Sequence, residues 1–133
     1  NFLIAYNVNL NTTSTRRANA VAFDIREKGR PVRVGNQFTG KIALDEKGNE
    51  IWTPGTLKAC KAIGWFIEEY GIAQVSINLT DITITPLHVA FEEASKRAME
   101  RGLRATGSEL VGVVPLKAML DAGKYFLEKQ QRS

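Results

Sequence analysis

The sequence has very little of the two residue types that build cross-linked and metal-bound proteins. Its 133 residues include one cysteine, Cys60, and one histidine, His88. One cysteine excludes a disulfide within the chain and a multi-cysteine zinc site, and one histidine excludes any site that needs two histidine ligands from this chain. We therefore expect no metal site. The scarcity of cysteine agrees with a reducing compartment, and we expect a cytoplasmic protein.

Long apolar runs and known catalytic motifs are also missing. No run approaches the roughly 20 apolar residues of a transmembrane helix, so we expect no membrane partner. The sequence lacks a Walker loop, a dinucleotide fingerprint, a zinc motif and a Gly-x-Ser-x-Gly elbow. What remains is an ordinary globular composition, with 44% hydrophobic residues, 24% charged residues and a net charge of +4. We expect a single domain over residues 1–133, since a domain usually holds roughly 100–200 residues.

Hydrophobic periodicity predicts an alternation of strands and helices. Alternating apolar residues indicate strands, and apolar residues at i, i+3, i+4 and i+7 indicate helices. The order β-α-β-β-α-β predicts a ferredoxin-like α+β sandwich, with both crossover helices on one face of an antiparallel sheet. The strands are expected over residues 2–9, 58–69, 72–80 and 103–111, with a helix after the first and third strands and an additional C-terminal helix that begins at Pro115.

Four residues mark the expected ends of the two crossover helices. Gly29 is expected in the left-handed conformation at the end of the first helix. Thr85 is expected to cap the second helix, with Pro86 in its first turn and Gly102 at its end. The buried faces are expected to comprise Ala18, Val21, Ala22 and Ile25 in the first helix and Leu87, Ala90, Phe91, Ala94 and Ala98 in the second.

The stretch over residues 30–56 has a different character, because glycine and proline interrupt it. Residues 41–44 and 50–52 flank Lys47-Gly48-Asn49, a pattern that predicts a β-hairpin. A structureless loop of this length is unusual in a compact domain. We therefore expect a hairpin-like arm at about residues 30–56.

The strand over residues 72–80 has the clearest alternation in the chain. Its apolar residues are expected to face the helices and its polar residues to face away. Amides and hydroxyls on a rigid sheet can orient a polar ligand without titrating. A solvated sheet face has the same pattern, so the residues alone allow both interpretations. The apolar set is Ala73, Val75, Ile77 and Leu79; the polar set is Gln74, Ser76 and Asn78, with Asn7 and Asn9 beside it by parity.

Several charged or reactive residues are further candidates. His88 could act as a general acid or base, but its place near the start of the second helix favours a structural role. Arg16 and Arg17, in the first turn of the first helix, could bind an anion or lie in solvent. Cys60 has no histidine nearby in the sequence, which argues against a nucleophile. For Lys58, Lys61 and Glu109, a ligand contact and a solvated side chain both stay open.

Several segments together resemble the C-terminal subdomain of the glutamate formiminotransferase family. The opening run Phe2-Leu3-Ile4-Ala5-Tyr6-Asn7-Val8-Asn9-Leu10 is similar to the strand that opens that subdomain. The run Gly107-Ser108-Glu109-Leu110-Val111-Gly112 and its continuation to residue 118 are also similar. The other similar segments are residues 25–30, 61–65, 73–81 and 85–88, so the resemblance covers nearly the whole chain.

This resemblance implies an enzyme that moves the formimino group from N-formimino-L-glutamate to N5 of tetrahydrofolate in histidine degradation. In this family two α/β subdomains face each other across the substrates, and the catalytic histidine belongs to the N-terminal subdomain. The resemblance therefore implies no catalytic residue in this chain, and His88 does not inherit that role. Gln74, Ser76 and Asn78 are then expected to position the substrate. The folate-binding segment reaches this chain at Phe2, Leu3, Ile4, Ala5, Tyr6 and Asn7.

The resemblance also implies that the chain is one part of a longer protein. The sequence opens inside a strand-like run and stops before the helical C-terminal segment of the family. We therefore expect the N-terminal catalytic subdomain as a partner, a homo-oligomer, no nucleic-acid ligand, and no formimino transfer by the isolated chain. From the residues alone two other classes stay open. One is a ferredoxin-like regulatory module that binds a small molecule, and the other is an RNA-binding sandwich, which the net charge of +4 favours weakly.

Overall fold

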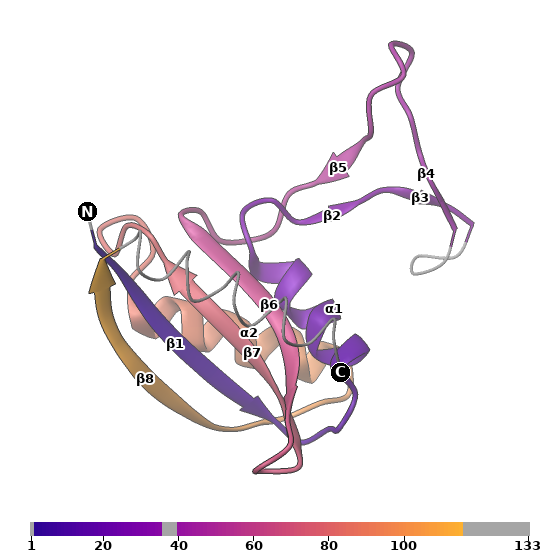
Figure 1. The fold of residues 1–133 in the computed structure, drawn as a ribbon. Helices are drawn as coiled ribbons and strands as arrows, with labels where there is room; N and C mark the ends of the chain where they lie inside the picture. Colours follow the sequence, from indigo (N-terminus) through magenta and orange to yellow (C-terminus); the bar gives the residue numbers. More distant parts are fainter. Residues whose placement is uncertain (1, 36–39, 116–133) are drawn as a thin grey trace.

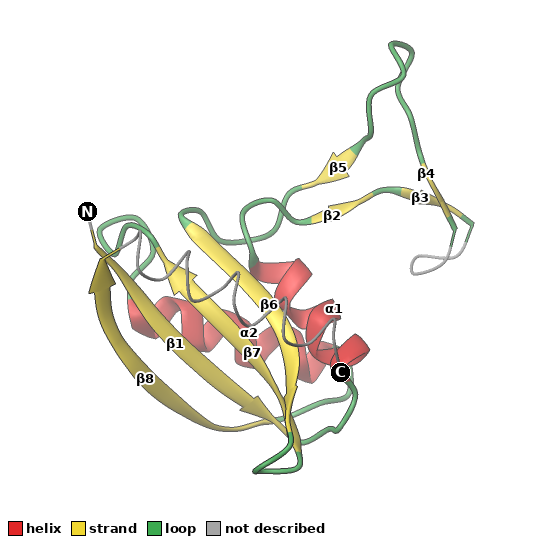
Figure 2. Ribbon diagram, viewed as in Figure 1, coloured by secondary structure: helices red, strands yellow, loops and turns green. Residues whose placement is uncertain are grey.

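The computed structural model describes residues 2–35 and 40–115. Its centre is a four-stranded antiparallel sheet with the strand order β6-β7-β1-β8. Helices α1 (Thr15–Ile25) and α2 (Leu87–Glu100) lie side by side on one face of this sheet (Figure 1, Figure 2). This arrangement confirms the ferredoxin-like α+β sandwich. The strands are β1 (Phe2–Leu10), β6 (Cys60–Ile67), β7 (Ile72–Leu79) and β8 (Ala105–Pro115).

Strands β1 and β7 form the centre of the sheet, and their pairing decides which side chains face the helices. Tyr6 pairs with Ile77 and Val8 pairs with Val75, and all four side chains are buried in the core beneath the helices. Because side chains alternate along a strand, the residues between them face the other way. The predicted directions of the alternating residues of β7 are therefore confirmed.

Helix α1 packs closely against β6 because a glycine lies at the contact. The predicted buried face of α1, from Ala18 to Ile25, is fully buried. At Gly64 the backbones come so near that a Cβ atom would stand 2.3 Å from the backbone nitrogen of Asn19. The Asn19 side chain accepts a hydrogen bond from the Gly64 N–H at 2.7 Å, which ties the helix to the strand.

The prediction that Gly29 ends α1 is wrong, although Gly29 does adopt a positive φ of 73°. The helix ends four residues earlier, at Ile25, and Arg26 is its C-cap. Gly29 lies instead where two stretches of backbone cross, since a Cβ atom there would stand 1.8 Å from the carbonyl oxygen of Thr53. A close backbone approach, rather than helix termination, therefore requires this glycine.

Helix α2 begins one residue later than predicted. Pro86 occupies the N-cap, while the Thr85 hydroxyl donates a hydrogen bond to the Lys58 carbonyl oxygen at 2.6 Å. The end of the helix is as predicted, with Gly102 in the left-handed conformation at a φ of 76°. Within the described residues, neither helix is long and apolar enough to cross a membrane.

Strand β8 is longer than predicted and ends at Pro115, which was expected to begin a helix. The strand pairs with β1 from Leu10, opposite Ala105, to Phe2, opposite Pro115. An irregularity in register near Gly112 lets the two strands stay paired over this length. The predicted C-terminal helix falls on residues 116–133, which lie outside the described residues.

The predicted arm is present and projects away from the sheet (Figure 1). Its outer part is the predicted hairpin, in which Leu44 pairs with Glu50 around a turn with Gly48 at a φ of 83°. At its base, the N–H of Leu57 donates to the Ile25 carbonyl oxygen at 3.0 Å, at the end of α1. Next to the base, β2 (Arg30–Pro31) pairs with β5 (Trp52–Thr53). A separate branch of the arm holds β3 (Arg33–Val34), which pairs with β4 (Lys41–Ile42) (Figure 1).

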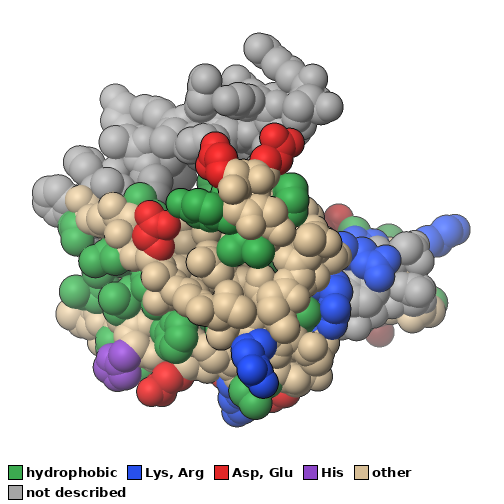
Figure 3. All heavy atoms as spheres, turned by 90° about the horizontal axis from the view of Figure 1, so that it is seen from below, with side chains coloured by type: hydrophobic (Ala, Val, Ile, Leu, Met, Phe, Trp, Pro, Cys, Tyr) green, Lys and Arg blue, Asp and Glu red, His purple; other side chains and the backbone are tan. Residues whose placement is uncertain are grey.

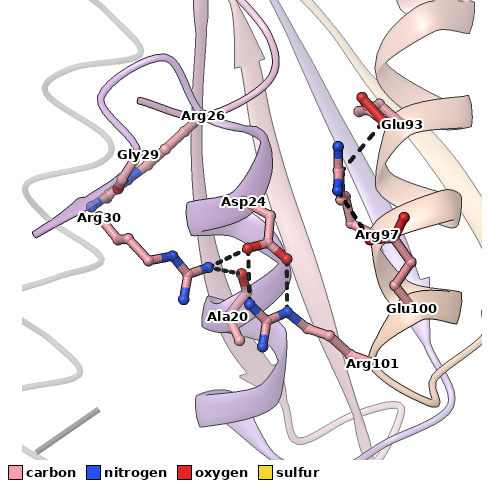
Figure 4. A network of polar contacts seen from close by, with 9 residues as sticks. All are labelled: Ala20, Asp24, Arg26, Gly29, Arg30, Glu93, Arg97, Glu100 and Arg101. Atoms are coloured by element: carbon pink, nitrogen blue, oxygen red, sulfur yellow. Dashed lines mark hydrogen bonds and ion pairs between the residues drawn. The ribbon is translucent and has the colours of Figure 1, made fainter. Parts of the chain in front are cut away.

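A half-buried group of charges, here called the Asp24 cluster, joins α1, α2 and the arm (Figure 4). Asp24 of α1 accepts two hydrogen bonds from the Arg101 guanidinium, at 2.7 and 2.9 Å, just beyond α2. Arg30 of the arm donates to the same carboxylate and to the Ala20 carbonyl oxygen, the latter at 2.8 Å. Hydrogen bonds between charged groups are stronger than neutral ones, so the Asp24 cluster stabilises the junction of three elements.

Gly64→Ala is expected to destabilise the fold, because the new methyl group would collide with the backbone of α1. Overpacking of this kind costs about 1–3 kcal/mol, which urea unfolding would show as a lower midpoint. Gly107→Ala is the matched control, since a Cβ atom there meets only the Asn9 side chain, at 3.8 Å. Equal midpoints for the two variants would contradict the close packing of α1 on β6.

Asp24→Asn is expected to weaken the junction, because the amide loses its charge while two guanidinium groups remain. The free energy of unfolding should fall by about 1–3 kcal/mol, and limited proteolysis should cut the arm faster. Glu93→Gln is the control, since its carboxylate is as buried as that of Asp24 but makes a 3.6 Å contact with Arg97 one turn along the same helix, and such pairs contribute little. A loss of stability no larger than that of Glu93→Gln would show that the Asp24 cluster contributes little.

Candidate functional site

The sheet face opposite the helices carries three polar rows that cross all four strands. Residues that pair directly in an antiparallel sheet lie on the same face, so the registers of β6, β7, β1 and β8 define each row. We call these rows together the polar face. The first row holds Trp65, Gln74, Asn9 and Gly107; the second holds Ile63, Ser76, Asn7 and Glu109; the third holds Lys61, Asn78, Ala5 and Gly112.

The three predicted positioning residues lie together on β7 but differ in exposure. Ser76 and Asn78 are half-buried, whereas Gln74 is only 2% exposed. Alternate residues of a strand lie roughly 6.6 Å apart, so the three side chains span about 13 Å. Ser76 and Asn78, the two half-buried members, could orient a small polar ligand.

The first row is linked by hydrogen bonds between side chains. The Trp65 indole N–H donates to Gln74 Oε1 at 3.2 Å, and Gln74 Nε2 donates to Asn9 Oδ1 at 2.5 Å. Both polar ends of Gln74 are therefore occupied by neighbours in the row. Gln74 holds the row together, and Asn9 lies at its outer end next to Gly107.

The third row contains an acceptor without a donor. Asn78 Oδ1 is buried, and no hydrogen-bond partner for it lies among the described residues. A buried polar atom left unpaired costs about 1–3 kcal/mol, so a donor supplied by a ligand or by a facing protein surface would stabilise this position. Lys61 precedes Asn78 in the row and is exposed on the edge strand β6.

The predicted folate segment at the start of β1 is divided between the two faces. Leu3, Ala5 and Asn7 lie on the polar face, and the first two are buried. Ile4 and Tyr6 face the helices, where the Tyr6 ring meets the Phe91 ring edge-on. Phe2 pairs with Pro115 at the end of the sheet. Of this segment, only alternate side chains could therefore contact a ligand on the polar face.

A cavity of about 280 Å³ opens at the end of β1 and β7 where this segment begins. Leu3 and Ile4 line one side, and Asp81 and Ile82 line another. Hydrogen bonds from the Thr83 hydroxyl and backbone lower the pKa of Asp81, which keeps this exposed carboxylate ionised. The cavity therefore combines apolar walls with one negative charge.

The reactive residues that the sequence left open do not gather into a catalytic set. His88 is exposed on α2, which covers the opposite face of the sheet. Burial and the charge of Glu27 raise the pKa of Cys60 to about 12, so its thiol stays protonated and unreactive near neutral pH. The Arg17 guanidinium donates to the Arg101 carbonyl oxygen at 2.8 Å. No group of three potential metal-ligating side chains occurs among the described residues.

Charge on the polar face is balanced. Its rows contain one cation and one anion, Lys61 and Glu109, which are exposed on the two edge strands. Seen from below, Lys and Arg side chains gather toward the end of the molecule that carries the arm (Figure 3). The excess positive charge of the chain is therefore not concentrated in the rows that form the candidate site.

Sequence reasoning missed the contribution of β6 to this face. Trp65 and Ile63 complete the first and second rows, but neither was considered as a site residue. The signal was present in the alternation of β6, where Cys60, Ala62 and Gly64 are buried and the residues between them face away. A strand was expected over residues 58–69, but small residues on its buried side made it hard to tell which side chains face away from the helices.

Comparison with the sequences of known proteins identifies the family. Residues 5–133 match the formiminotransferase domain family. The chain is 44% identical over 129 residues to formimidoyltransferase-cyclodeaminase of Sus scrofa, and 44% identical over 129 residues to that of Dictyostelium discoideum; each match covers 97% of this chain and 20% of the relative. It is 32% identical over 127 residues to glutamate formimidoyltransferase of Thermoplasma acidophilum, covering 96% of this chain and 34% of the relative. The chain thus spans about a fifth to a third of the relatives' length, and it belongs to the formiminotransferase domain family.

Proposed function

We propose that this chain is the C-terminal subdomain of a folate-dependent glutamate formiminotransferase. In the whole protein, the formimino group of N-formimino-L-glutamate is transferred to N5 of tetrahydrofolate, as a step of histidine degradation in the cytoplasm. The observation that carries this proposal is the polar face, whose two central strands present neutral amides and a hydroxyl on the side of the sheet away from its helices. Membership of the formiminotransferase domain family indicates which reaction such a face would support.

The reaction requires two substrates to be held in a defined geometry. The N5 amine attacks the formimino carbon, a new C–N bond forms, the bond from that carbon to the glutamate nitrogen breaks, and glutamate leaves with the transferred proton. Holding both reactants in place is a large part of such catalysis. Ser76 and Asn78, with Asn7 beside them, offer a hydroxyl and two amides on a rigid sheet for this purpose.

Asn78 Oδ1, the unpaired acceptor in the third row, favours a ligand or partner that carries N–H groups. Asn78 Oδ1 would accept a hydrogen bond from an N–H of the pteridine or of the formimino group. The Phe2 to Asn7 segment runs past this position, and the cavity lined by Leu3 and Asp81 lies at its start. These neighbours are consistent with tetrahydrofolate as the acceptor substrate along β1.

The proposal places proton transfer on groups outside this chain. Amides and hydroxyls do not titrate near neutral pH, and the only histidine is exposed on α2. The N-terminal subdomain would supply the catalytic histidine and would face the polar face across the substrates. In the proposed function this subdomain is also part of a homo-oligomer.

Ser76→Ala and Asn78→Ala in the full-length protein should lower kcat/KM by roughly threefold to a hundredfold, because each removes a hydrogen bond to a held substrate. The melting temperature should stay nearly unchanged, since neither side chain enters the helix-packed core. Ser108→Ala is the matched control, because Ser108 pairs with Val8 and faces the helix side at the exposed edge of β8. If kcat/KM is unaltered in both polar-face variants, the polar face has only a structural role.

His88→Ala in the full-length protein should leave kcat/KM and its pH dependence unchanged within about twofold. The reason is positional, since His88 is exposed on α2 and the sheet separates it from the polar face. Steady-state rates measured between pH 6 and pH 9 test this expectation. A large loss of kcat, with loss of a pKa from the rate profile, would mean that the chemistry has been placed on the wrong side of the sheet.

A further inference from the structure

We propose that Asn9 is a ligand-binding residue of the polar face and that its side-chain NH2 group donates to a carbonyl or carboxylate oxygen of a bound substrate. Trp65 and Gln74 are positioning residues that hold Asn9 in this orientation. The proposal rests on the proposed function, because it requires a substrate on the polar face. It concerns the first row, which lies beside the row of Ser76.

The direction of the hydrogen bonds in the first row follows from the chemistry of tryptophan. An indole N–H can only donate, so Gln74 must present its oxygen to Trp65, at 3.2 Å. The amide nitrogen of Gln74 then points the other way and donates to Asn9 Oδ1 at 2.5 Å. Because the Trp65 indole cannot accept a hydrogen bond, it fixes the orientation of the Gln74 amide and, through it, that of the Asn9 amide.

The same order turns the Asn9 donor away from Gln74, toward Gly107. Its oxygen is occupied by Gln74, and no acceptor for Asn9 Nδ2 lies among the described residues. The next residue in the row is Gly107, which has no side chain to cover this nitrogen; a Cβ atom there would stand 3.8 Å from it. Asn9 is half-buried, whereas its neighbour Gln74 is almost fully buried.

Burial separates the roles of the three residues. Gln74 is 2% exposed and uses both ends of its amide inside the row, so it acts on a ligand only through Asn9. Because Asn9 offers a neutral donor, its complement is an oxygen with free lone pairs. Both substrates carry such oxygens, in the carboxylates of N-formimino-L-glutamate and in the carbonyl and carboxylates of tetrahydrofolate.

Asn9→Asp in the full-length protein tests the donor directly. Aspartate keeps an oxygen that accepts from Gln74 and replaces the NH2 group by a negatively charged oxygen. The KM for the substrate whose oxygen binds Asn9 should rise roughly tenfold to a hundredfold, while the KM for the other substrate changes little. Initial rates with each substrate varied in turn therefore show which of the two supplies the oxygen.

Trp65→Phe tests the orientation without touching the ligand-facing group. Phenylalanine keeps an aromatic ring but removes the N–H, so Gln74 and Asn9 can both reverse. The KM affected by Asn9→Asp should rise roughly threefold to tenfold, with kcat within about twofold of wild type. Trp52→Phe is the matched control, because the Trp52 indole N–H donates to Glu50 in the arm, at 3.2 Å. It should change neither KM.

The outcomes separate this proposal from the proposed function. If Asn9→Asp and Trp65→Phe leave both KM values within twofold while Ser76→Ala lowers kcat/KM, the assignment of Asn9 is wrong and the polar face remains a substrate site. If only Asn9→Asp acts, the positioning role of Trp65 is wrong. If Ser76→Ala and Asn78→Ala are also without effect, or the wild-type protein transfers no formimino group, the proposed function fails.

Discussion

The antiparallel register between β1 and β7 is the constraint on which the rest of the molecule depends. These two strands occupy the centre of the sheet, and each crossover helix connects one of them to an edge strand. Their pairing buries Tyr6, Val8, Val75 and Ile77 beneath the helices. A slip of one residue would bring amides into the core and apolar side chains to the opposite face, so the core and the candidate site are specified by the same pairing.

The polar face has a neutral centre and charged edges. Its two central strands carry amides and hydroxyls, whereas Lys61 and Glu109 lie on the edge strands β6 and β8. Neutral groups keep the same hydrogen-bonding character across the physiological pH range. In the proposed function, such a surface would hold the substrates in place, and acid–base chemistry would be carried by groups on the other subdomain.

Sequence patterns predicted the sheet well where the two faces differ in polarity. In β7 the alternation of Val75 and Ser76 was unambiguous, and the structure agrees with it. The patterns failed where contacts distant in sequence decide the outcome. Gly29 is required by the nearby backbone of Thr53, and the Thr85 hydroxyl donates to the Lys58 carbonyl oxygen. Neither residue therefore has the helix-terminal role that local sequence rules predict.

The candidate site was predicted in composition but not in organisation. The polar set of β7 and its neighbours Asn7 and Asn9 could be recognised by parity alone. The hydrogen bonds that link Trp65, Gln74 and Asn9 could not, because they depend on which residues of three strands lie opposite one another. The roles of the predicted folate and substrate residues remain predictions. The strand register shows which of these residues lie on the polar face.

The crossing of backbone at the base of the arm has a consequence for how the chain can vary in length. A Cβ atom at Gly29 would meet the backbone of Thr53, and one at Gly55 would stand 1.9 Å from the carbonyl oxygen of Arg26, so the chain leaves and re-enters the body at one point. Residues added at the hairpin tip near Gly48 would lengthen the arm without displacing these fixed ends. The tip is thus the natural place to insert an epitope or a fluorescent reporter, because such a guest would be carried outside the sheet.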